Sequence, residues 1–414
     1  MTTTHSRRAE AGDETAGHRP YVMLGMATAG FALTFWAWAL LAPLGAHFKQ
    51  ALGLTSFQQA LLVAVPVIVG ALGRIPVGAL TDRYGGQVMF PVVSFATIVP
   101  VLFLGLVGYR SLTTLLVGGF FLGLAGTSFA VGVPFVNAWF PAERRGMAIG
   151  VFGIGMGGTA ISALTTVKLT AHWSIHAPFL VVAGVLAVYG AAAALVLRDA
   201  PGRPVPSQPA LTRLAATLRL SITWQAAVLY AVGFGGFVAF SVYLPTYLKN
   251  AYLLTPADAA NKMAGFVLLA VLLRPVGGWL SDRLAPTRVL TGAFALVATA
   301  AIIQSLAPAL APVGTVAFLV MAAALGAAAG AVFALVAQRA PAQQVGAVTG
   351  VVGAAGGLGG FVPPLVMGGI YGASGTYAWG LLALAAVAAC ALICSFSTPS
   401  QPVRTRSKTR TRAA

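Results

Sequence analysis

Arg74 and Arg274 are the two basic residues that lie inside long apolar stretches of this 414-residue chain. Each stands eight residues before an aspartate, Asp82 or Asp282, which is about 12 Å along a helix that rises about 1.5 Å per residue. If each aspartate marks a helix end, each guanidinium lies near the middle of an apolar layer about 30 Å thick. An arginine at that depth costs about 2.5–3.5 kcal/mol to insert, so such residues usually face a cavity and serve function.

The acidic residues offer neither arginine a partner inside the apolar layer. We place all eight in tails, loops or the central linker: Glu10, Asp13, Glu14, Asp82, Glu143, Asp199, Asp258 and Asp282. Two cations that face one cavity without a carboxylate require an anionic ligand, and the planar fork of arginine suits a planar oxyanion. The alternative, snorkelling to the surface, needs positions closer to the helix ends. We therefore expect Arg74 and Arg274 to bind a small anion.

The remaining sequence is typical of a membrane protein, with 58% hydrophobic and only 8% charged residues, against about 25% charged in soluble proteins. Apolar stretches of about 20 residues recur, and each is long enough to cross a bilayer. We predict an all-α membrane protein with twelve transmembrane helices. They lie near residues 22–46, 58–80, 88–109, 112–138, 146–169, 177–197, 223–247, 263–281, 287–307, 312–337, 345–369 and 376–396.

The net charge of +17 has a distribution that favours a membrane over nucleic acid. Most Lys and Arg fall in the tails, the central linker and alternate short loops. The positive-inside rule then places both termini and the linker in the cytoplasm, with the basic tail against anionic lipid. The opposite side has only five basic residues: Lys49, Arg110, Lys168, Lys249 and Lys262.

An internal repeat with an offset of 200 residues relates two halves of the chain. GRIPVGALTDR at 73–83 matches LRPVGGWLSDR at 273–283, and PAERRGMAIGVFGIGMGG at 141–158 matches PAQQVGAVTGVVGAAGGL at 341–358. Repeats of this kind place a transport site at their interface. We therefore expect two pseudo-symmetric six-helix bundles, at 21–197 and 223–396, joined by a cytoplasmic linker at 198–222. A cytoplasmic tail at 1–20 precedes them, and a basic cytoplasmic tail at 397–414 follows them.

Glycines are concentrated in the second of these matching segments. Small residues let membrane helices approach closely, and we expect them to allow the helices to slide as well as to pack. The glycines in question are Gly153, Gly155, Gly158, Gly353, Gly356 and Gly357.

The stretch GALTDRYGG at 78–86 resembles the loop motif of the major facilitator superfamily, and GGWLSDR at 277–283 is a weaker copy. The resemblance implies the superfamily's fold of two six-helix halves. We expect Asp82, Arg83, Asp282 and Arg283 to form a gating latch at the helix ends, because their charges can pair there or bind helix-terminal N–H groups.

GRIPVG, LRPVGGWLSDR and the glycine-rich segments also resemble the nitrate/nitrite porter family of that superfamily, from about Phe31 to Tyr371. The resemblance implies that the two arginines clamp nitrate or nitrite. It also implies that Phe129, Tyr230 and Phe234 lie beside the anion. The sequence departs from the family at Met156, where an asparagine is common, which removes an amide donor from the expected site.

We expect a multi-pass protein of the cytoplasmic (inner) membrane that works as a monomer by alternating access, without cofactor or metal. Nitrate/nitrite antiport and proton-coupled symport both remain open. The alternatives are a carrier of cyanate or a small carboxylate, and an anion sensor that does not transport. A proton antiporter for cations or drugs usually needs a membrane carboxylate, and an enzyme needs a nucleophile–base set or a phosphate loop; we identify neither in the sequence.

Overall fold

The computed structural model describes residues 3–141, 145–202, 210–341 and 345–396, and in this part of the chain the regular structure is entirely helical. The helices are α1 (Thr3–Trp38), α2 (Leu41–Leu52), α3 (Ser56–Leu72), α4 (Arg74–Tyr84), α5 (Gly86–Leu106), η1 (Gly108–Arg110), α6 (Leu112–Leu122), η2 (Gly123–Thr127), α7 (Ser128–Trp139), α8 (Arg145–Gly153), η4 (Ile154–Gly157), α9 (Gly158–His172), α10 (Ala177–Val196), α11 (Ala210–Leu218), α12 (Ser221–Tyr252), α13 (Pro256–Leu284), α14 (Pro286–Ser305), η5 (Leu310–Gly314), α15 (Thr315–Arg339), α16 (Val345–Gly359), α17 (Val362–Ser374) and α18 (Ala378–Phe396).

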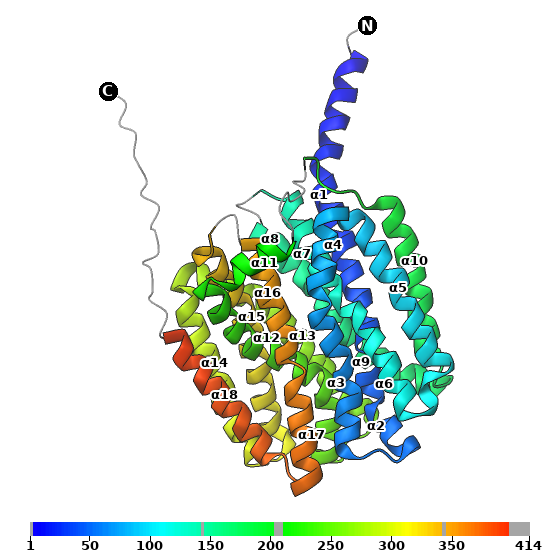
Figure 1. Ribbon diagram of the computed structural model, residues 1–414, viewed down its shortest axis with the longest axis vertical. Coiled ribbons are helices and arrows are strands. Elements are labelled where there is room, and N and C mark those ends of the chain that lie inside the picture. The colour runs from blue at the N-terminus through cyan, green and yellow to red at the C-terminus, as the bar shows by residue number, and fades with distance from the viewer. Residues whose placement is uncertain (1–2, 142–144, 203–209, 342–344, 397–414) are drawn as a thin grey trace.

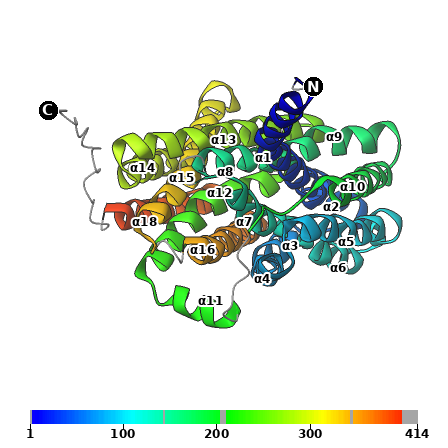
Figure 2. The ribbon, with the colours of Figure 1, turned by 90° about the horizontal axis from the view of Figure 1, so that it is seen from above.

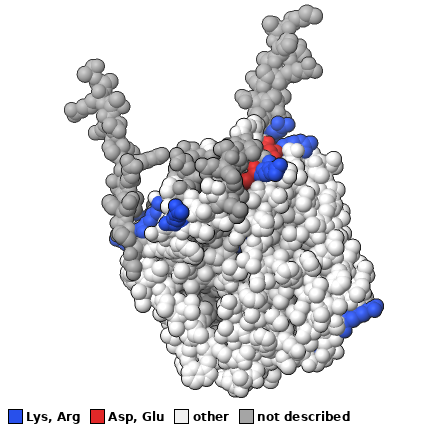
Figure 3. Space-filling model, in the orientation of Figure 1, with Lys and Arg blue, Asp and Glu red and all other residues white. Residues whose placement is uncertain are grey.

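These helices combine into twelve spans that are long and apolar enough to cross a membrane, counted over the described residues. The space-filling view agrees with this arrangement: most of the visible charged side chains lie toward the end where α1 begins, another basic side chain lies at the lower right edge, and a broad uncharged surface lies between them (Figure 3). An uncharged band of this kind suits the hydrocarbon core of a bilayer. The predicted all-α membrane fold is therefore confirmed.

The two halves stand side by side, the first coloured from blue to the green of α10 and the second from the green of α12 through yellow to red (Figure 1). The view from above shows the same division (Figure 2). Three seams join them: α3 packs on α16 and α17, α13 packs on α8 and α9, and α12 packs on α2. Each half contributes core-facing helices to the centre, as the repeat predicts.

Several spans of the first half are interrupted near the centre of the molecule. Gly73 separates α3 from α4, η2 separates α6 from α7, and η4 separates α8 from α9. In the second half α12, α13 and α15 run without a break, whereas α16 and α17 are separate. An interruption frees carbonyl groups from the helical ladder, and membrane proteins tolerate this only where other groups satisfy them. At η2 a side chain of another span supplies such a group, because Arg74 Nε donates to the carbonyl of Gly126 at 3.3 Å.

The halves close on each other at the end opposite to the start of α1, where α2 and α17 lie (Figure 1). Gln59 Nε2 of α3 donates to Thr246 Oγ1 of α12 at 3.0 Å, and both residues are buried. Gly368 of α17 is so close to α3 that a Cβ on it would lie 2.4 Å from Cβ of Ala60. We call this contact the outer closure.

The loop with the superfamily motif is held by Asp199, the second residue of the central linker. Gln87 N donates to Asp199 Oδ1 at 3.2 Å, and Asp199 N donates to Gln87 Oε1 at 3.4 Å. Gly85 adopts φ of 83°, and a Cβ there would overlap the Asp199 carboxylate at 1.6 Å. Glycine is thus required at Gly85 both by its backbone and by this carboxylate.

The predicted latch residues lie at the ends of α4 and α13. The Arg83 guanidinium lies 5.3 Å from the ring centre of Tyr84, and that of Arg283 lies 4.2 Å from the ring centre of Trp279. The side chain of Asp282 lies outside the described residues. A gating role for Asp82, Arg83, Asp282 and Arg283 stays a prediction.

Candidate functional site

Arg74 is the first residue of α4 and is only 7% exposed. The break at Gly73 lets its side chain reach carbonyls on two other spans. Nε donates to the carbonyl of Gly126 in η2 at 3.3 Å, and Nη1 donates to the carbonyl of Gly353 in α16 at 2.6 Å. Arg74 therefore bridges the first half to the second through neutral acceptors.

Arg274 lies within the unbroken helix α13 and is 8% exposed. Its Nη2 donates to the hydroxyl of Tyr230 at 2.8 Å. Its Nη1 donates to Sδ of Met156, which belongs to η4 of the first half. Arg274 thus makes the reciprocal bridge, from the second half to the first. The methionine at the family's asparagine position contributes a weak acceptor to it.

An aromatic platform lies against both arginines. The rings of Tyr230 and Phe234 stack with centres 4.8 Å apart and planes 3° apart. The guanidinium carbon of Arg74 lies 5.6 Å from the centre of the Phe234 ring, and that of Arg274 lies 5.7 Å from it. The ring centre of Phe129 also lies near Arg74, 5.2 Å from its guanidinium carbon. Cation–π contacts of this kind are worth about 2 kcal/mol or more when desolvated, so the rings hold the arginines at depth.

The structure brings together all six residues that we predicted for substrate binding, and it adds Phe333 of α15. This ring lies 5.7 Å from the guanidinium of Arg274, and its centre lies 4.8 Å from that of Tyr230. Sequence reasoning missed it because one phenylalanine in an alanine-rich span resembles ordinary core. The signal in the sequence was a large aromatic ring among small residues, in the stretch GAAAGAVFALV at 326–336.

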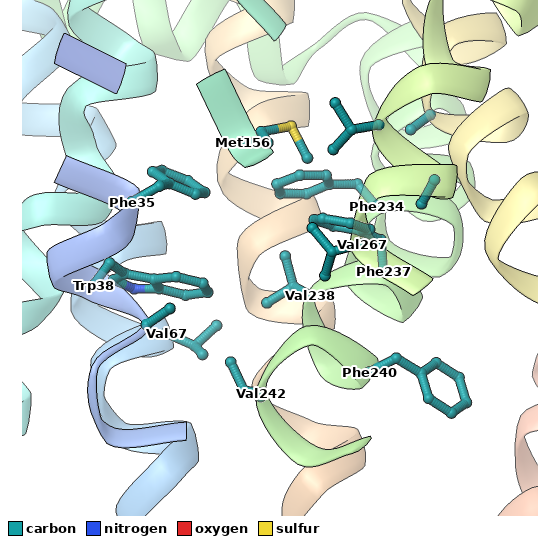
Figure 4. Packing of buried hydrophobic residues seen from close by; sticks show 14 of the residues in the cluster. Phe35, Trp38, Val67, Met156, Phe234, Phe237, Val238, Phe240, Val242 and Val267 are labelled. Atoms are coloured by element: carbon teal, nitrogen blue, oxygen red, sulfur yellow. The ribbon is translucent and has the colours of Figure 1, made fainter. Parts of the chain in front are cut away.

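A small cavity adjoins Arg74 between the halves. Figure 4 shows Phe35 and Trp38 of α1 on one side and Phe234 and Val238 of α12 on the other, with Met156 beside Phe234. The cavity has a volume of about 10 Å³, which is about the space that one water molecule needs. Its lining consists of Phe35, Trp38, Val67, Gly70, Ala71, Arg74, Gly126, Val238 and Gly357. An anion of several atoms needs the side chains around it to move.

The predicted glycines divide into two groups. Four pack closely: a Cβ would lie 2.7 Å from the Phe31 ring at Gly155, 1.9 Å from the Ala32 carbonyl at Gly158, 2.3 Å from the Tyr230 ring at Gly356 and 2.7 Å from Cβ of Ala71 at Gly357. The other two have room and face the site. A Cβ would lie 3.8 Å from Cδ of Arg274 at Gly153 and 3.4 Å from the Phe129 ring at Gly353.

The arrangement suits reversible binding of a small anion. The hydrogen-bond partners that the structure gives Arg74 and Arg274 are carbonyl, thioether and phenol groups, all of them neutral. These groups satisfy N–H donors but leave the two positive charges uncompensated. An oxyanion between the guanidinium groups would replace weak acceptors with charge-assisted hydrogen bonds.

Comparison with known proteins supports the same family. Residues 27–260 and 226–414 match the model of the Major Facilitator Superfamily. The chain is 47% identical over 367 residues to a "Probable nitrate/nitrite transporter NarK2" of Mycobacterium tuberculosis, covering 88% of this chain and 93% of the relative. It is 34% identical over 374 residues to a "Nitrite extrusion protein" of Bacillus subtilis, covering 90% and 92%.

Two further comparisons cover most of the chain. A "Probable nitrate/nitrite antiporter NarK1" of Thermus thermophilus is 32% identical over 379 residues, covering 83% of this chain and 84% of the relative. Among solved structures, a bacterial homolog of the human lysosomal transporter Spinster aligns with a TM-score of 0.68 at 18% identity. That alignment covers 92% of this chain and 97% of the other. At this identity the structural likeness shows the fold alone.

Proposed function

The chain belongs to the nitrate/nitrite porter family of the Major Facilitator Superfamily, and from this premise we propose that it carries nitrate and nitrite across the cytoplasmic membrane. The names of its relatives support the substrates. One observation carries the proposal for the site: two buried, repeat-related arginines from opposite halves lie against one ring, Phe234, and their described hydrogen-bond partners are neutral.

The anion binds between Arg74 and Arg274, with Tyr230 as a hydrogen-bond partner and Phe129, Phe234 and Phe333 as flat walls. A weakly hydrated planar anion fits between aromatic rings, and the forks of the arginines match its oxygen atoms. Met156 gives the site a soft apolar edge where an amide is usual. Binding of this kind compensates charge that otherwise stays buried.

Transport follows from rocking of the two halves about this site. The outer closure seals the outer side of the site, and its release exposes the arginines to that side. Closing around two arginines without an anion is costly because like charges then approach in a region of low dielectric. The empty carrier therefore switches slowly, which favours exchange of nitrate for nitrite over net flux.

The topology follows the distribution of positive charge. Both termini and the linker lie in the cytoplasm, and the outer closure faces the opposite side. The bundles span 21–197 and 223–396, joined by a linker over 198–222 and flanked by tails over 1–20 and 397–414. The charge of the basic tail, which lies outside the described residues, suits anionic lipid. One chain supplies both arginines and so holds a complete site, and we infer that the protein works as a monomer.

The test is uptake of labelled nitrate into proteoliposomes that contain nitrite, without a pH gradient. We expect uptake in the wild type and a loss of about tenfold or more in Arg274→Lys, because a lysine keeps the charge but loses the hydrogen-bonding fork. Arg288→Lys is the matched control, since Arg288 is exposed at the start of α14, and it should transport like the wild type.

The remaining outcomes separate the alternatives. Uptake that appears only with an inward proton gradient makes the protein a symporter. No nitrate uptake under either condition refutes the substrate, and the same vesicles then test cyanate and formate. Loss of transport in Arg288→Lys as well would show that the effect of Arg274→Lys is not specific to the site.

A further inference from the structure

A third pair of matching segments lies at the end of the first membrane span of each half. FKQALGLT at 48–55 corresponds to LKNAYLLT at 248–255, at the same offset of 200 residues. The match makes Lys49 of α2 and Lys249 of α12 equivalent positions of the repeat. On the side of the outer closure, these two lysines are the basic residues that occupy equivalent positions in both halves. Arg74 and Arg274 are the corresponding pair at the centre.

The backbone repeats as well as the sequence. Gly53 ends α2 with φ of 64°, and Leu253 ends α12 with φ of 55°. The following helices are then capped alike: Thr55 Oγ1 accepts from the N–H of Gln58 at 3.1 Å, and Thr255 Oγ1 accepts from the N–H of Asp258 at 3.1 Å. A side chain rarely adopts the left-handed conformation of Leu253. That the second half keeps it without glycine indicates that this corner has the same geometry in both halves.

The two lysines lie at the seam between the halves. Lys49 follows Gly45 by four residues, and a Cβ on Gly45 would lie 3.7 Å from Thr246 Oγ1 of the other half. Lys249 follows Thr246 by three. Residues three and four apart share one face of a helix, so both lysines extend the face that forms the outer closure. Both are partly buried, and their helices α2 and α12 pack on each other.

The described contacts leave the two charges largely uncompensated. Lys49 Nζ donates to the neutral hydroxyl of Ser56 at 3.1 Å, and an ammonium group has three donors. Asp258, the acid that we expect on this side of the membrane, accepts at Oδ2 from Thr255 Oγ1 of its own helix cap at 2.6 Å. The next residue after Lys249, Asn250, donates to the hydroxyl of Tyr377 at 2.9 Å.

We propose that Lys49 and Lys249 form an outer site for a small inorganic oxyanion, which collects the anion before it reaches the central arginines. The proposal rests on the proposed function and deepens it. Ammonium groups are compact and strongly hydrated, so they hold an anion loosely, whereas an arginine fork holds it through paired hydrogen bonds. The anion thus passes from a weak site to a strong one. Between the lysines it also offsets their repulsion as the outer closure forms.

The test is the double variant Lys49→Gln/Lys249→Gln in proteoliposomes of known sidedness. We expect the KM for nitrate presented from the outer side to rise roughly threefold to tenfold at low ionic strength, with little change in maximal rate. The difference should shrink at high ionic strength, because salt screens exposed charges. The KM from the cytoplasmic side should stay as in the wild type. Lys49→Arg/Lys249→Arg should restore the outer KM.

The matched control is Lys168→Gln/Lys262→Gln, which removes the same charge from exposed positions on the same side. An equal rise of KM in this control, a rise on both sides of the membrane, or an unchanged outer KM in the test variant would overturn the proposal.

A second readout does not depend on flux. In the Arg274→Lys background we compare the thermal unfolding temperature in sodium nitrate and in sodium gluconate of equal ionic strength. We expect nitrate still to raise the unfolding temperature in this background, and we expect Lys49→Gln/Lys249→Gln to abolish that rise. No rise by nitrate before the two lysines are replaced would overturn the outer site. Failure of the proposed function looks different, because the wild type would then carry no nitrate in either vesicle assay.

Discussion

Arg74 donates to the carbonyl of Gly353 in the opposite half at 2.6 Å, and this relationship has a repeat-related counterpart. Gly153 corresponds to Gly353 at the offset of 200 residues, and it lies against Arg274, whose Cδ would be 3.8 Å from a Cβ placed there. Each arginine therefore meets a glycine of the other half. Rocking of the halves changes both contacts together, which couples the two arginines to one conformational change.

The first prediction uses two glycines of α16. Gly356→Ala should reduce nitrate uptake strongly, because its Cβ would lie 2.3 Å from the Tyr230 ring and displace the hydroxyl that Arg274 binds. Gly353→Ala should have a smaller effect, since its Cβ would lie 3.4 Å from Phe129. Initial rates in proteoliposomes measure both. Gly350→Ala, with open space around it, is the control, and an equal loss in all three variants would contradict the explanation.

The second prediction concerns the hydroxyl of Tyr230. Tyr230→Phe keeps the ring on Phe234 but removes the acceptor of the 2.8 Å hydrogen bond from Arg274. A hydrogen bond to a charged group contributes about 1.5–3 kcal/mol, so we expect the KM for nitrate to rise about tenfold or more. Tyr243→Phe removes a buried hydroxyl far along the same helix and should leave KM unchanged. A KM for Tyr230→Phe equal to that of the wild type would exclude the hydroxyl from binding.

Much of the fold and of the site could be predicted from the sequence, because membrane helices and buried charges leave strong signals. Apolar length identified the spans, and the repeat paired Arg74 with Arg274. Their depth followed from helical rise alone. The confirmed relationship to the nitrate/nitrite porter family rested on motifs at the same positions.

Other features could not be predicted because they depend on distances between segments far apart in the chain. Phe333 became part of the site only when α15 was placed beside α12 and α13. The carbonyl of Gly353 is an acceptor that any residue there would supply, so no side chain marked it. Asp199 was placed in the linker by charge, but its contact with Gly85 depends on how the end of α10 meets the loop before α5.

The third prediction concerns the residue that departs from the family. Met156→Asn should lower the KM for nitrate relative to that for nitrite. The amide of asparagine would donate a further hydrogen bond, and nitrate has one more oxygen atom than nitrite to accept it. Competition of each unlabelled anion against labelled nitrate measures the ratio. Met156→Leu keeps the volume without sulfur or amide, and it should not shift the ratio toward nitrate. A shift of equal size in both variants would show that shape, not hydrogen bonding, sets the preference.

The fourth prediction tests the outer closure. Gly368→Leu should hold the halves apart on that side, because even its Cβ would lie 2.4 Å from Cβ of Ala60. Thr246 is 2% exposed in this conformation. In a background without Cys390 and Cys394, a Thr246→Cys reporter should then react faster with an impermeant maleimide from outside, while nitrate exchange falls. Gly369→Leu is the matched control, since its nearest neighbour outside its own helix, Phe57, would be 4.0 Å away, and it should do neither. Faster labelling with undiminished exchange would show that transport does not need this contact to form.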